Sequence, residues 1–130
     1  MSHKPIVVVD DNLVNLKLVK VLLVKNDFLV YTATNAAETM AILETIHPDL
    51  ILMDIQLPGM DGLELTRQLK ADFRTHDISV IALTAFAMKG DEQKIREAGC
   101  DGYISKPIDV DTFIEAIAPF LNNQEKKERV

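Results

Sequence analysis

The sequence is poor in the residues that mark secreted, zinc-binding and membrane proteins. A single cysteine, Cys100, excludes an intramolecular disulfide, and His3, His47 and His76 are too far apart in sequence to form a zinc-binding spacing. We interpret the three histidines as solvated surface residues. No segment is long and apolar enough to span a bilayer, and the N-terminus has no signal-peptide core. We therefore expect a cytoplasmic protein with no membrane partner.

Basic residues are in the minority. The chain has 14 Lys and Arg against 20 Asp and Glu, which gives a formal net charge of -6 at pH 7. Proteins that bind nucleic acid usually carry a basic face, so we expect protein partners and no nucleic acid. The length of 130 residues, with 48% apolar and 26% charged side chains, is that of one compact domain.

The stretch 49–58, DLILMDIQLP, is the most informative part of the sequence. Its continuous apolar run is typical of a strand buried on both faces of a parallel sheet, and it leads into Asp54. A carboxylate at the end of a buried strand is destabilising unless a cation or a hydrogen-bond donor meets it. The position of Asp54 therefore indicates a chemical role.

Strands and helices alternate along the chain, which predicts an open parallel sheet with helices on both faces. Asn12 is the predicted N-cap of the first helix, Asp109 that of the last, and Pro119 should kink or shorten that last helix. The polar segment 122–130 is predicted to be frayed or disordered. The predicted strands are 5–9, 28–33, 49–54, 78–83 and 102–105, and the predicted helices are 13–25, 35–46, 63–71, 89–97 and 109–121.

Polar side chains follow four of these strands, at the sheet edge where such folds bind ligands. They are Asp10, Asp11, Asp54, Thr84 and Lys106. Three carboxylates in one pocket repel each other, and a divalent cation would remove the conflict. Oxygen ligands favour Mg²⁺ or Mn²⁺ over zinc. With a lysine and a hydroxyl nearby, the set predicts stabilisation of a phosphoryl group on Asp54 as nucleophile. The alternative is a structural ion-pair network, which three acids on adjacent strand ends make a poor explanation.

These motifs resemble the receiver domain of two-component response regulators, the CheY-like family. The resemblance covers residues 4–121 and rests on Asp10-Asp11, on Asp54 within LILMDIQLPGMDG, on Thr84-Ala85 and on Lys106-Pro107. The segments LILMDIQLP, LTAFAMKGDE and GCDGYISKPI are similar to those of single-domain regulators of cell division. Related segments occur in receivers of hybrid histidine kinases.

The resemblance implies an α/β fold of the flavodoxin-like (βα)5 type, doubly wound, with five parallel strands in the order 2-1-3-4-5. It also implies a single receiver domain over residues 1–121 and a polar tail over 122–130 with no output domain. Asp54 would accept a phosphoryl group from a histidine kinase or a histidine phosphotransfer protein. The chain would catalyse its own phosphorylation and slow dephosphorylation without being a multi-substrate enzyme.

The resemblance assigns further roles at the site. Asp11 and Asp54 would hold Mg²⁺, or Mn²⁺ in its place, together with the backbone carbonyl of Gln56. Asp10 would act mostly through water, and Lys106 would pair with the phosphoryl oxygens.

A switch is implied as well. Thr84 would hydrogen-bond a phosphoryl oxygen, and Tyr103 would rotate into the space that opens. The small Ala85 would leave the phosphoryl group accessible, and the Lys106–Pro107 peptide bond is expected to be cis.

Gln56 and Phe86 match the family positions that tune the lifetime of the phosphoryl group. Because Phe86 is apolar where fast-hydrolysing relatives carry an acid, we predict a comparatively long-lived phosphate on Asp54. Loss of label from the purified phosphoprotein within seconds would contradict this prediction. The alternative is that Phe86 only packs within its loop.

Output is expected to pass through protein contacts of a monomer or weak dimer. The resemblance points to the surface of the fourth helix, the fifth strand and the fifth helix, with Met88, Tyr103 and Phe113 on or near it. Ordinary packing is the alternative, above all for Phe113.

The first helix carries more apolar residues than burial requires. Val14, Val21 and Val24 fall on a different stripe from the residues predicted to face the sheet. We interpret this stripe as a docking face for the phosphodonor, or alternatively as scattered surface valines.

Four other functions can be compared with the residues present. A phosphohydrolase of the haloacid-dehalogenase type needs an acid two residues after its nucleophile, where Gln56 stands. A flavodoxin-like cofactor binder needs a hydroxyl- and glycine-rich loop, and the segment 11–14, DNLV, opens with an acid instead. A receiver that serves only as an adaptor usually lacks one of the five site residues, and none is missing. A phosphorelay shuttle related to the receivers of hybrid kinases stays open.

Overall fold

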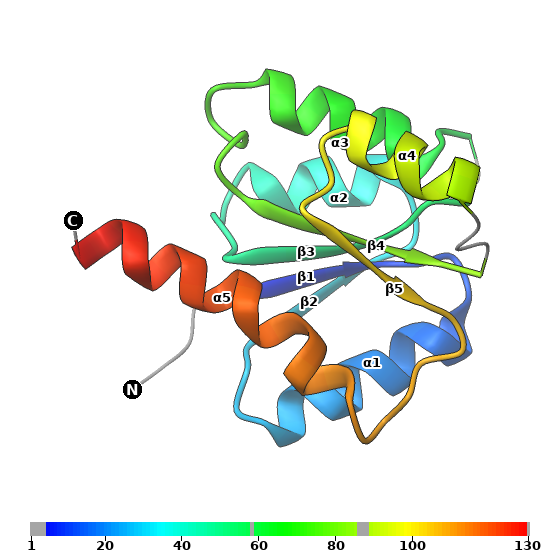
Figure 1. Cartoon of the computed structure of the whole chain (residues 1–130), viewed down its shortest axis with the longest axis vertical. Coiled ribbons are helices and arrows are strands. Elements are labelled where there is room, and N and C mark those ends of the chain that lie inside the picture. The colour runs from blue at the N-terminus through cyan, green and yellow to red at the C-terminus, as the bar shows by residue number, and fades with distance from the viewer. Residues whose placement is uncertain (1–4, 58, 86–88, 130) are drawn as a thin grey trace.

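The computed structural model describes residues 5–57, 59–85 and 89–129, with side chains described up to Leu121 except at positions 89 and 90 (Figure 1). Five strands alternate with five helices. The strands are β1 (Ile6–Val9), β2 (Val30–Ala33), β3 (Leu50–Asp54), β4 (Ser79–Thr84) and β5 (Gly102–Ser105). The helices are α1 (Leu13–Lys25), α2 (Ala36–Leu43), α3 (Gly62–Ala71), α4 (Lys89–Glu97) and α5 (Phe113–Arg129).

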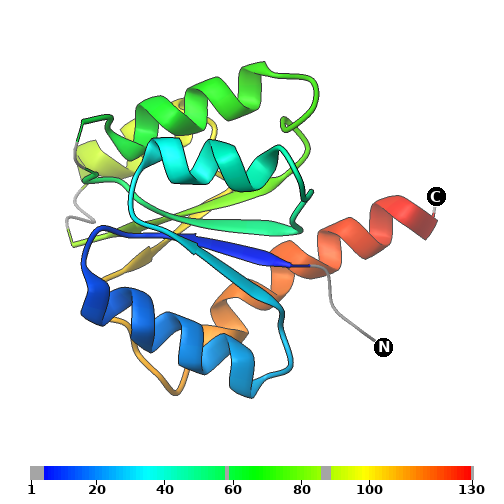
Figure 2. The same ribbon diagram turned by 180° about the vertical axis from the view of Figure 1, so that it is seen from behind.

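The five strands form one parallel sheet in the order β2-β1-β3-β4-β5. Helices α1 and α5 cover one face, and α2, α3 and α4 cover the other (Figures 1 and 2). Every residue of the three central strands, β1, β3 and β4, is buried, whereas the edge strands β2 and β5 are mostly half-buried. This arrangement confirms the predicted flavodoxin-like (βα)5 fold, and the continuous apolar run before Asp54 is explained by burial on both faces.

Each face of the sheet has its own apolar core. Leu16, Val19 and Leu23 of α1 pack on one side with Phe113 and Ile117 of α5. The opposite core is built around buried residues of α3 and α4, with α2 packed against it through half-buried side chains. Among the described helices, none is long and apolar enough to cross a lipid bilayer.

The last helix differs from the prediction at both ends. Asp109 accepts the first bonds of a turn, from the backbone N–H of Thr112 at 3.2 Å and of Phe113 at 3.0 Å, and α5 begins only at Phe113. Its predicted end at Leu121 is wrong, because the helix continues past Pro119 to Arg129. Segment 122–129 is therefore helical where a frayed tail was expected, and its Gln, Glu, Lys and Arg residues are good helix formers. This end of α5 reaches beyond the body of the fold (Figures 1 and 2).

Two other elements are shorter than predicted by two residues or more. Strand β2 begins at Val30, because Asp27 has a left-handed backbone (φ 68°) and the Phe28 N–H bonds back to the Leu23 carbonyl of α1 at 3.0 Å. Helix α2 ends at Leu43, and the chain then turns towards Pro48, which disfavours helix in the residue before it.

Candidate functional site

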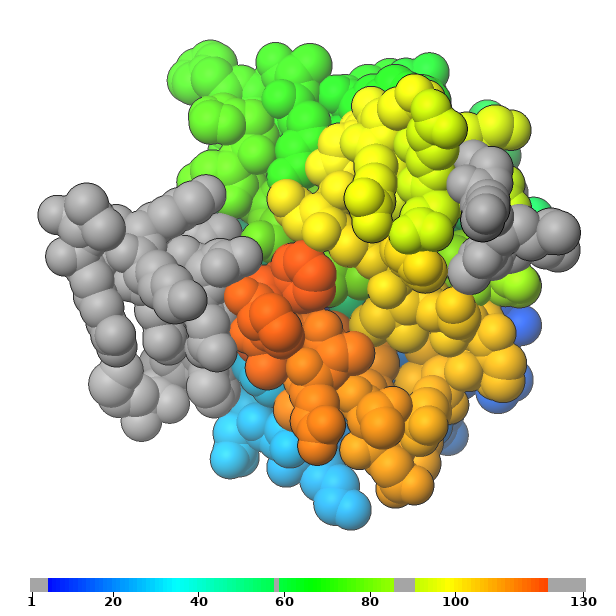
Figure 3. Space-filling model, in the orientation of Figure 1, coloured from blue at the N-terminus to red at the C-terminus, as the bar shows by residue number. Residues whose placement is uncertain are grey.

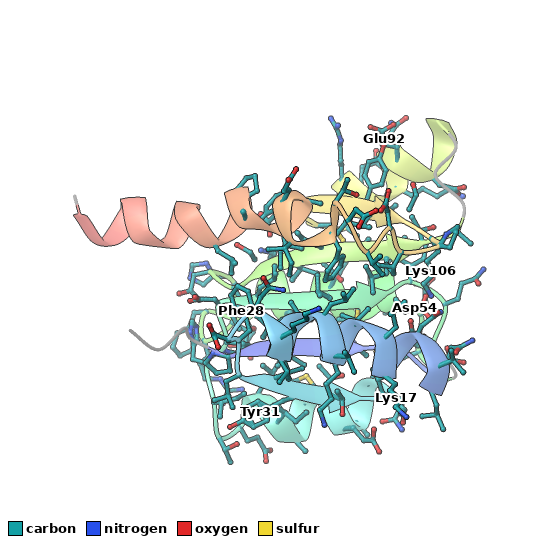
Figure 4. The ribbon with its side chains drawn as sticks, turned by 90° about the horizontal axis from the view of Figure 1, so that it is seen from below. Lys17, Phe28, Tyr31, Asp54, Glu92 and Lys106 are labelled. Carbon is teal, nitrogen blue, oxygen red and sulfur yellow. The ribbon has the colours of Figure 1, made fainter. Side chains whose placement is uncertain are left out.

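The carboxyl ends of four strands bring the predicted polar residues to one edge of the sheet. Asp10 follows β1, Asp54 ends β3, Thr84 ends β4 and Lys106 follows β5. The parallel register aligns these ends, and the Lys106 N–H donates to the Thr84 carbonyl at 2.8 Å. Figure 4 shows Asp54 and Lys106 at the same end of the sheet, with Phe28 at the opposite end.

Lys106 lies between two buried carboxylates. Its Nζ is 3.2 Å from Asp10 Oδ2 and 3.3 Å from Asp54 Oδ2. The side chains of Asp10 and Asp54 are 1% and 7% exposed, against 18% for Lys106. The ammonium group is thus the counter-charge that makes two neighbouring buried acids tolerable.

Backbone donors hold the other oxygen of each acid. Asp10 Oδ1 accepts from the Asn12 N–H at 2.9 Å, and Asp54 Oδ1 accepts from the Gln56 N–H at 3.0 Å. Asn12 also caps α1, with its side-chain oxygen 3.0 Å from the Val14 N–H. In both acids, Oδ1 is therefore hydrogen-bonded to the backbone and Oδ2 is directed at Lys106.

The environment of Asp54 disfavours its charged form. Burial raises the pKa of Asp54 to about 6, and the nearby Asp10 charge acts in the same direction. The Gln56 N–H and the Lys106 ammonium lower this pKa and only partly offset the burial. At pH 7 a carboxyl with this pKa is still mostly ionised, and more positive charge at this point would lower the pKa further.

The acids fit a hard divalent cation. Asp10, Asp11 and Asp54 each offer a carboxylate oxygen, and these oxygens lie within 4.8 Å of one another. Asp10 Oδ2 is buried and accepts no hydrogen bond from any described residue, since its contact with Lys106 has the distance of an ion pair without hydrogen-bond geometry. A buried carboxylate oxygen with no hydrogen bond is a position that a cation or its water would satisfy. Asp11 is exposed and lies on the open side of the cluster.

Gly62 contributes to the site although the sequence analysis missed it. A Cβ at this position would overlap the carbonyl oxygen of Asp54 and come within 2.8 Å of Ile55 Cα. The Gly62 N–H also donates to the Ile55 carbonyl at 3.0 Å. The first turn of α3 thus packs directly on the backbone that carries Asp54. The Asp61-Gly62 pair beside a predicted helix start was the one signal available in the sequence.

The remaining predicted residues divide into three groups. Thr84 is buried at the end of β4, and Tyr103 is half-buried against the core on the α3 and α4 side of the sheet. The Lys106–Pro107 peptide bond is cis, as the sequence resemblance implied. Phe86 and Met88 lie outside the described residues.

The two predicted partner faces differ in exposure. Phe113 is only 1% exposed and belongs to the core beneath α1 and α5, which confirms ordinary packing, the alternative given for this residue. Val14, Val21 and Val24 are 78%, 53% and 51% exposed, so the valine stripe on α1 does face outwards.

Comparison with known proteins gives one consistent result. A sequence model of the response regulator receiver domain matches residues 6–118. The polar-differentiation response regulator DivK of Brucella ovis is 48% identical over 120 residues, which span 92% of this chain and 98% of DivK. A CheY-like receiver domain protein from Methanospirillum hungatei has a TM-score of 0.88 at 32% identity, covering 97% of this chain and 99% of that one.

A further solved structure is similar over most of the chain. The receiver domain of a sensor histidine kinase from Pseudomonas aeruginosa has a TM-score of 0.84 at 28% identity, covering 93% of this chain and 99% of that one. A magnesium ion is coordinated in the active-site cleft of that receiver.

Proposed function

Because the chain belongs to the family of response regulator receiver domains, we propose that it accepts a phosphoryl group on Asp54 and signals through protein contacts. The phosphodonor is a histidine kinase or a histidine phosphotransfer protein. The observation that carries the proposal is the position of Lys106 Nζ, 3.3 Å from the Oδ2 of a buried Asp54 and equally close to Asp10.

In the proposed reaction Asp54 Oδ2 attacks the phosphorus of a phosphohistidine. The new O–P bond forms as the N–P bond breaks, and the imidazole leaves with the electron pair and takes up a proton. Gln56 holds Asp54 Oδ1 through its N–H, which leaves Oδ2 as the oxygen directed at the donor. Lys106 stabilises the negative charge on the transferred group, and the Thr84 hydroxyl bonds one of its oxygens.

The site would hold Mg²⁺, or Mn²⁺ in its place. Asp11 and Asp54 would be direct ligands with the backbone carbonyl of Gln56, and Asp10 would act through water. When bound, the ion supplies positive charge that neutralises the phosphoryl oxygens. The position of Asp10 Oδ2 supports this assignment, because its ion pair with Lys106 leaves it without a hydrogen bond from any described residue.

Phosphorylation would be read out by protein partners in the cytoplasm, with the protein itself a monomer or weak dimer and not a multi-substrate enzyme. Side chains of α4, β5 and α5 form one continuous face in Figure 3, which we propose as the output surface, with Tyr103 as its switch residue. The exposed valine stripe of α1 would dock the phosphodonor. The process that we propose is cell division, and the similarity to DivK, a polar-differentiation response regulator, over nearly its whole length supports a regulatory role of this kind.

Intact-mass measurement after incubation with acetyl phosphate and Mg²⁺ tests the proposal. Wild type should gain the mass of one phosphoryl group, and Asp54→Asn, which keeps the size of the side chain, should gain none. Asp111→Asn changes an exposed acid on the loop before α5 and should label like wild type.

Removal of Mg²⁺ with a chelator should also abolish labelling of the wild type. The proposal fails if wild type stays unlabelled under conditions that label another receiver, or if Asp54→Asn gains the same mass as wild type.

A further inference from the structure

Helix α1 has an outward surface that is both apolar and basic. We call the exposed residues along it the α1 surface, and they are Leu13, Val14, Lys17, Lys20, Val21, Val24 and Lys25. The spacing of Val14, Lys17 and Val21 places these three on one side of the helix, where they line a shallow hollow. Every charged residue of α1 is a lysine, in a chain whose net charge is -6.

A groove of about 710 Å³ lies between α2 and α3 on the opposite side of the sheet. Its apolar lining includes Ala37, Met40, Met60 and Leu65. The exposed side chain of Met40 is flexible and polarizable, so this lining can adapt to the shape of an apolar partner. We call this hollow the α2/α3 groove.

Acidic residues surround the α2/α3 groove. Glu44 lies one helical turn after Met40, Glu64 lies one turn before Gln68 on the groove wall, and Asp61 is next to Met60. All three acids are exposed. Helix α2 has no basic residue. Arg67 of α3 lies 3.8 Å from Glu64, and Arg74, which interacts with Glu44, is paired with Asp72 at 3.1 Å, so acids still outnumber bases around the groove.

We propose that the α1 surface of one copy of this chain docks in the α2/α3 groove of a second copy. The valines would enter the apolar groove, and the lysines would face its acidic rim. Two α1 surfaces would repel each other through their lysines, and two grooves through their acids. Charge therefore disfavours both contacts between like surfaces and favours the contact between unlike ones.

The positions of the two surfaces determine the form of the assembly. They lie on opposite faces of the sheet (Figures 1 and 2), so a copy that donates its α1 surface keeps its own groove free. The contact is head-to-tail, so at high protein concentration it would extend the proposed weak dimer by further copies instead of stopping at a symmetric dimer. One small groove makes it weak, and exposed charges make it sensitive to salt.

The assembly would also hide α1 from other proteins. Self-association would therefore compete with docking of the phosphodonor, and this consequence rests on the proposed function. The contact itself does not involve Asp54 and is tested on the unphosphorylated chain.

Sedimentation velocity at low salt, with protein concentrations up to the millimolar range, tests the proposal. The average mass of the wild type should rise with concentration beyond two copies and should fall when salt is added. Val21→Glu on α1 should raise the apparent dissociation constant at least about tenfold, as for loss of a central contact. The double variant Ala37→Gln/Met40→Gln should raise the apparent dissociation constant in the same way, because it makes the apolar groove lining polar. Both side chains are exposed and glutamine is neutral, so the fold and the net charge should not change.

Val110→Glu is the matched control. Val110 is 50% exposed, close to the 53% of Val21, lies on the loop before α5 and belongs to neither surface. It receives the same substitution and should assemble like wild type. Circular dichroism and thermal unfolding of each variant exclude loss of fold as the cause.

Mixing the two defective variants gives the decisive result. Val21→Glu keeps an intact groove and Ala37→Gln/Met40→Gln keeps an intact α1 surface, so an equal mixture should form one-to-one dimers and nothing larger. A mixture that stays monomeric overturns the proposal, as does a wild type that is monomeric at every concentration. Assembly that survives either variant, or that Val110→Glu also abolishes, overturns it as well and assigns the contact to other surfaces.

Discussion

Gly62 lies so close to Asp54 that any side chain at position 62 would overlap the Asp54 carbonyl oxygen. The acid that we propose as phosphoacceptor is therefore positioned by close packing of α3 on its own backbone. A hydrogen bond from the Gly62 N–H to the Ile55 carbonyl, 3.0 Å long, holds the two segments together. The orientation of Asp54 depends on a residue that has no side chain.

Gly62→Ala should disturb this packing. We expect the free energy of unfolding to fall by about 1–3 kcal/mol, as for overpacking at a tight contact, and labelling of Asp54 by acetyl phosphate to slow. Urea unfolding and intact-mass kinetics measure the two effects. Gly59→Ala is the control, because a Cβ there meets nothing within 4 Å and only the positive φ of 82° disfavours it. Equal labelling rates for Gly62→Ala and wild type would contradict the prediction.

Lys106→Gln should leave two buried carboxylates without their counter-charge. In the absence of Mg²⁺ we expect the free energy of unfolding to fall by about 1–3 kcal/mol, less than for a fully buried pair because Lys106 is 18% exposed. Added Mg²⁺ should shrink the difference, since the ion supplies charge at the same acids. Thermal unfolding with and without Mg²⁺ measures this, with the exposed Lys94→Gln as control. If Mg²⁺ leaves the difference in unfolding free energy between Lys106→Gln and wild type unchanged, the ion does not act on the acids that Lys106 contacts.

Asp11→Asn should separate metal binding from stability. Asp11 is exposed, so the metal-free variant should unfold within about 0.5 kcal/mol of the wild type. Wild type should gain about 2.7 kcal/mol when Mg²⁺ exceeds its dissociation constant a hundredfold, and the variant should lose most of that gain. Denaturant unfolding across a Mg²⁺ titration measures this gain in unfolding free energy. The control variant Asp111→Asn should gain as much as the wild type. The same gain in Asp11→Asn would remove Asp11 from the proposed ligands.

The strand ends could be predicted from the sequence because the information is local. Apolar runs that stop at Asp10, Asp54 and Thr84 mark buried strands, and parallel strands bring their carboxyl ends to one edge. The same local reasoning gave the cap at Asn12, which the structure shows with bonds to two backbone N–H groups.

Long-range packing could not be predicted in the same way. Position 62 requires glycine because the carbonyl oxygen of Asp54, on another element, lies next to it. No sequence pattern around Gly62 indicates this contact. For Phe113 the sequence left a partner face and ordinary packing open, and the structure decides for packing, because that turn of α5 faces the sheet. Pro119 predicts a shorter α5 than the structure shows, because the helix formers after it outweigh its effect.

Cys100 should be nearly unreactive in the folded protein. Burial raises the pKa of its thiol to about 11, although the nearby Thr66 hydroxyl, 3.9 Å from the sulfur, acts in the opposite direction. At pH 8 only about one thiol in a thousand would then be ionised, and the thiolate is the form that reacts. Iodoacetamide should therefore label the native chain far more slowly than the chain in urea, and the labelling rate should rise with pH beyond pH 9. Because the sequence has no other cysteine, the rate reports this position alone, and labelling as fast as that of a free thiol would show that the α3–α4 side of the core opens readily.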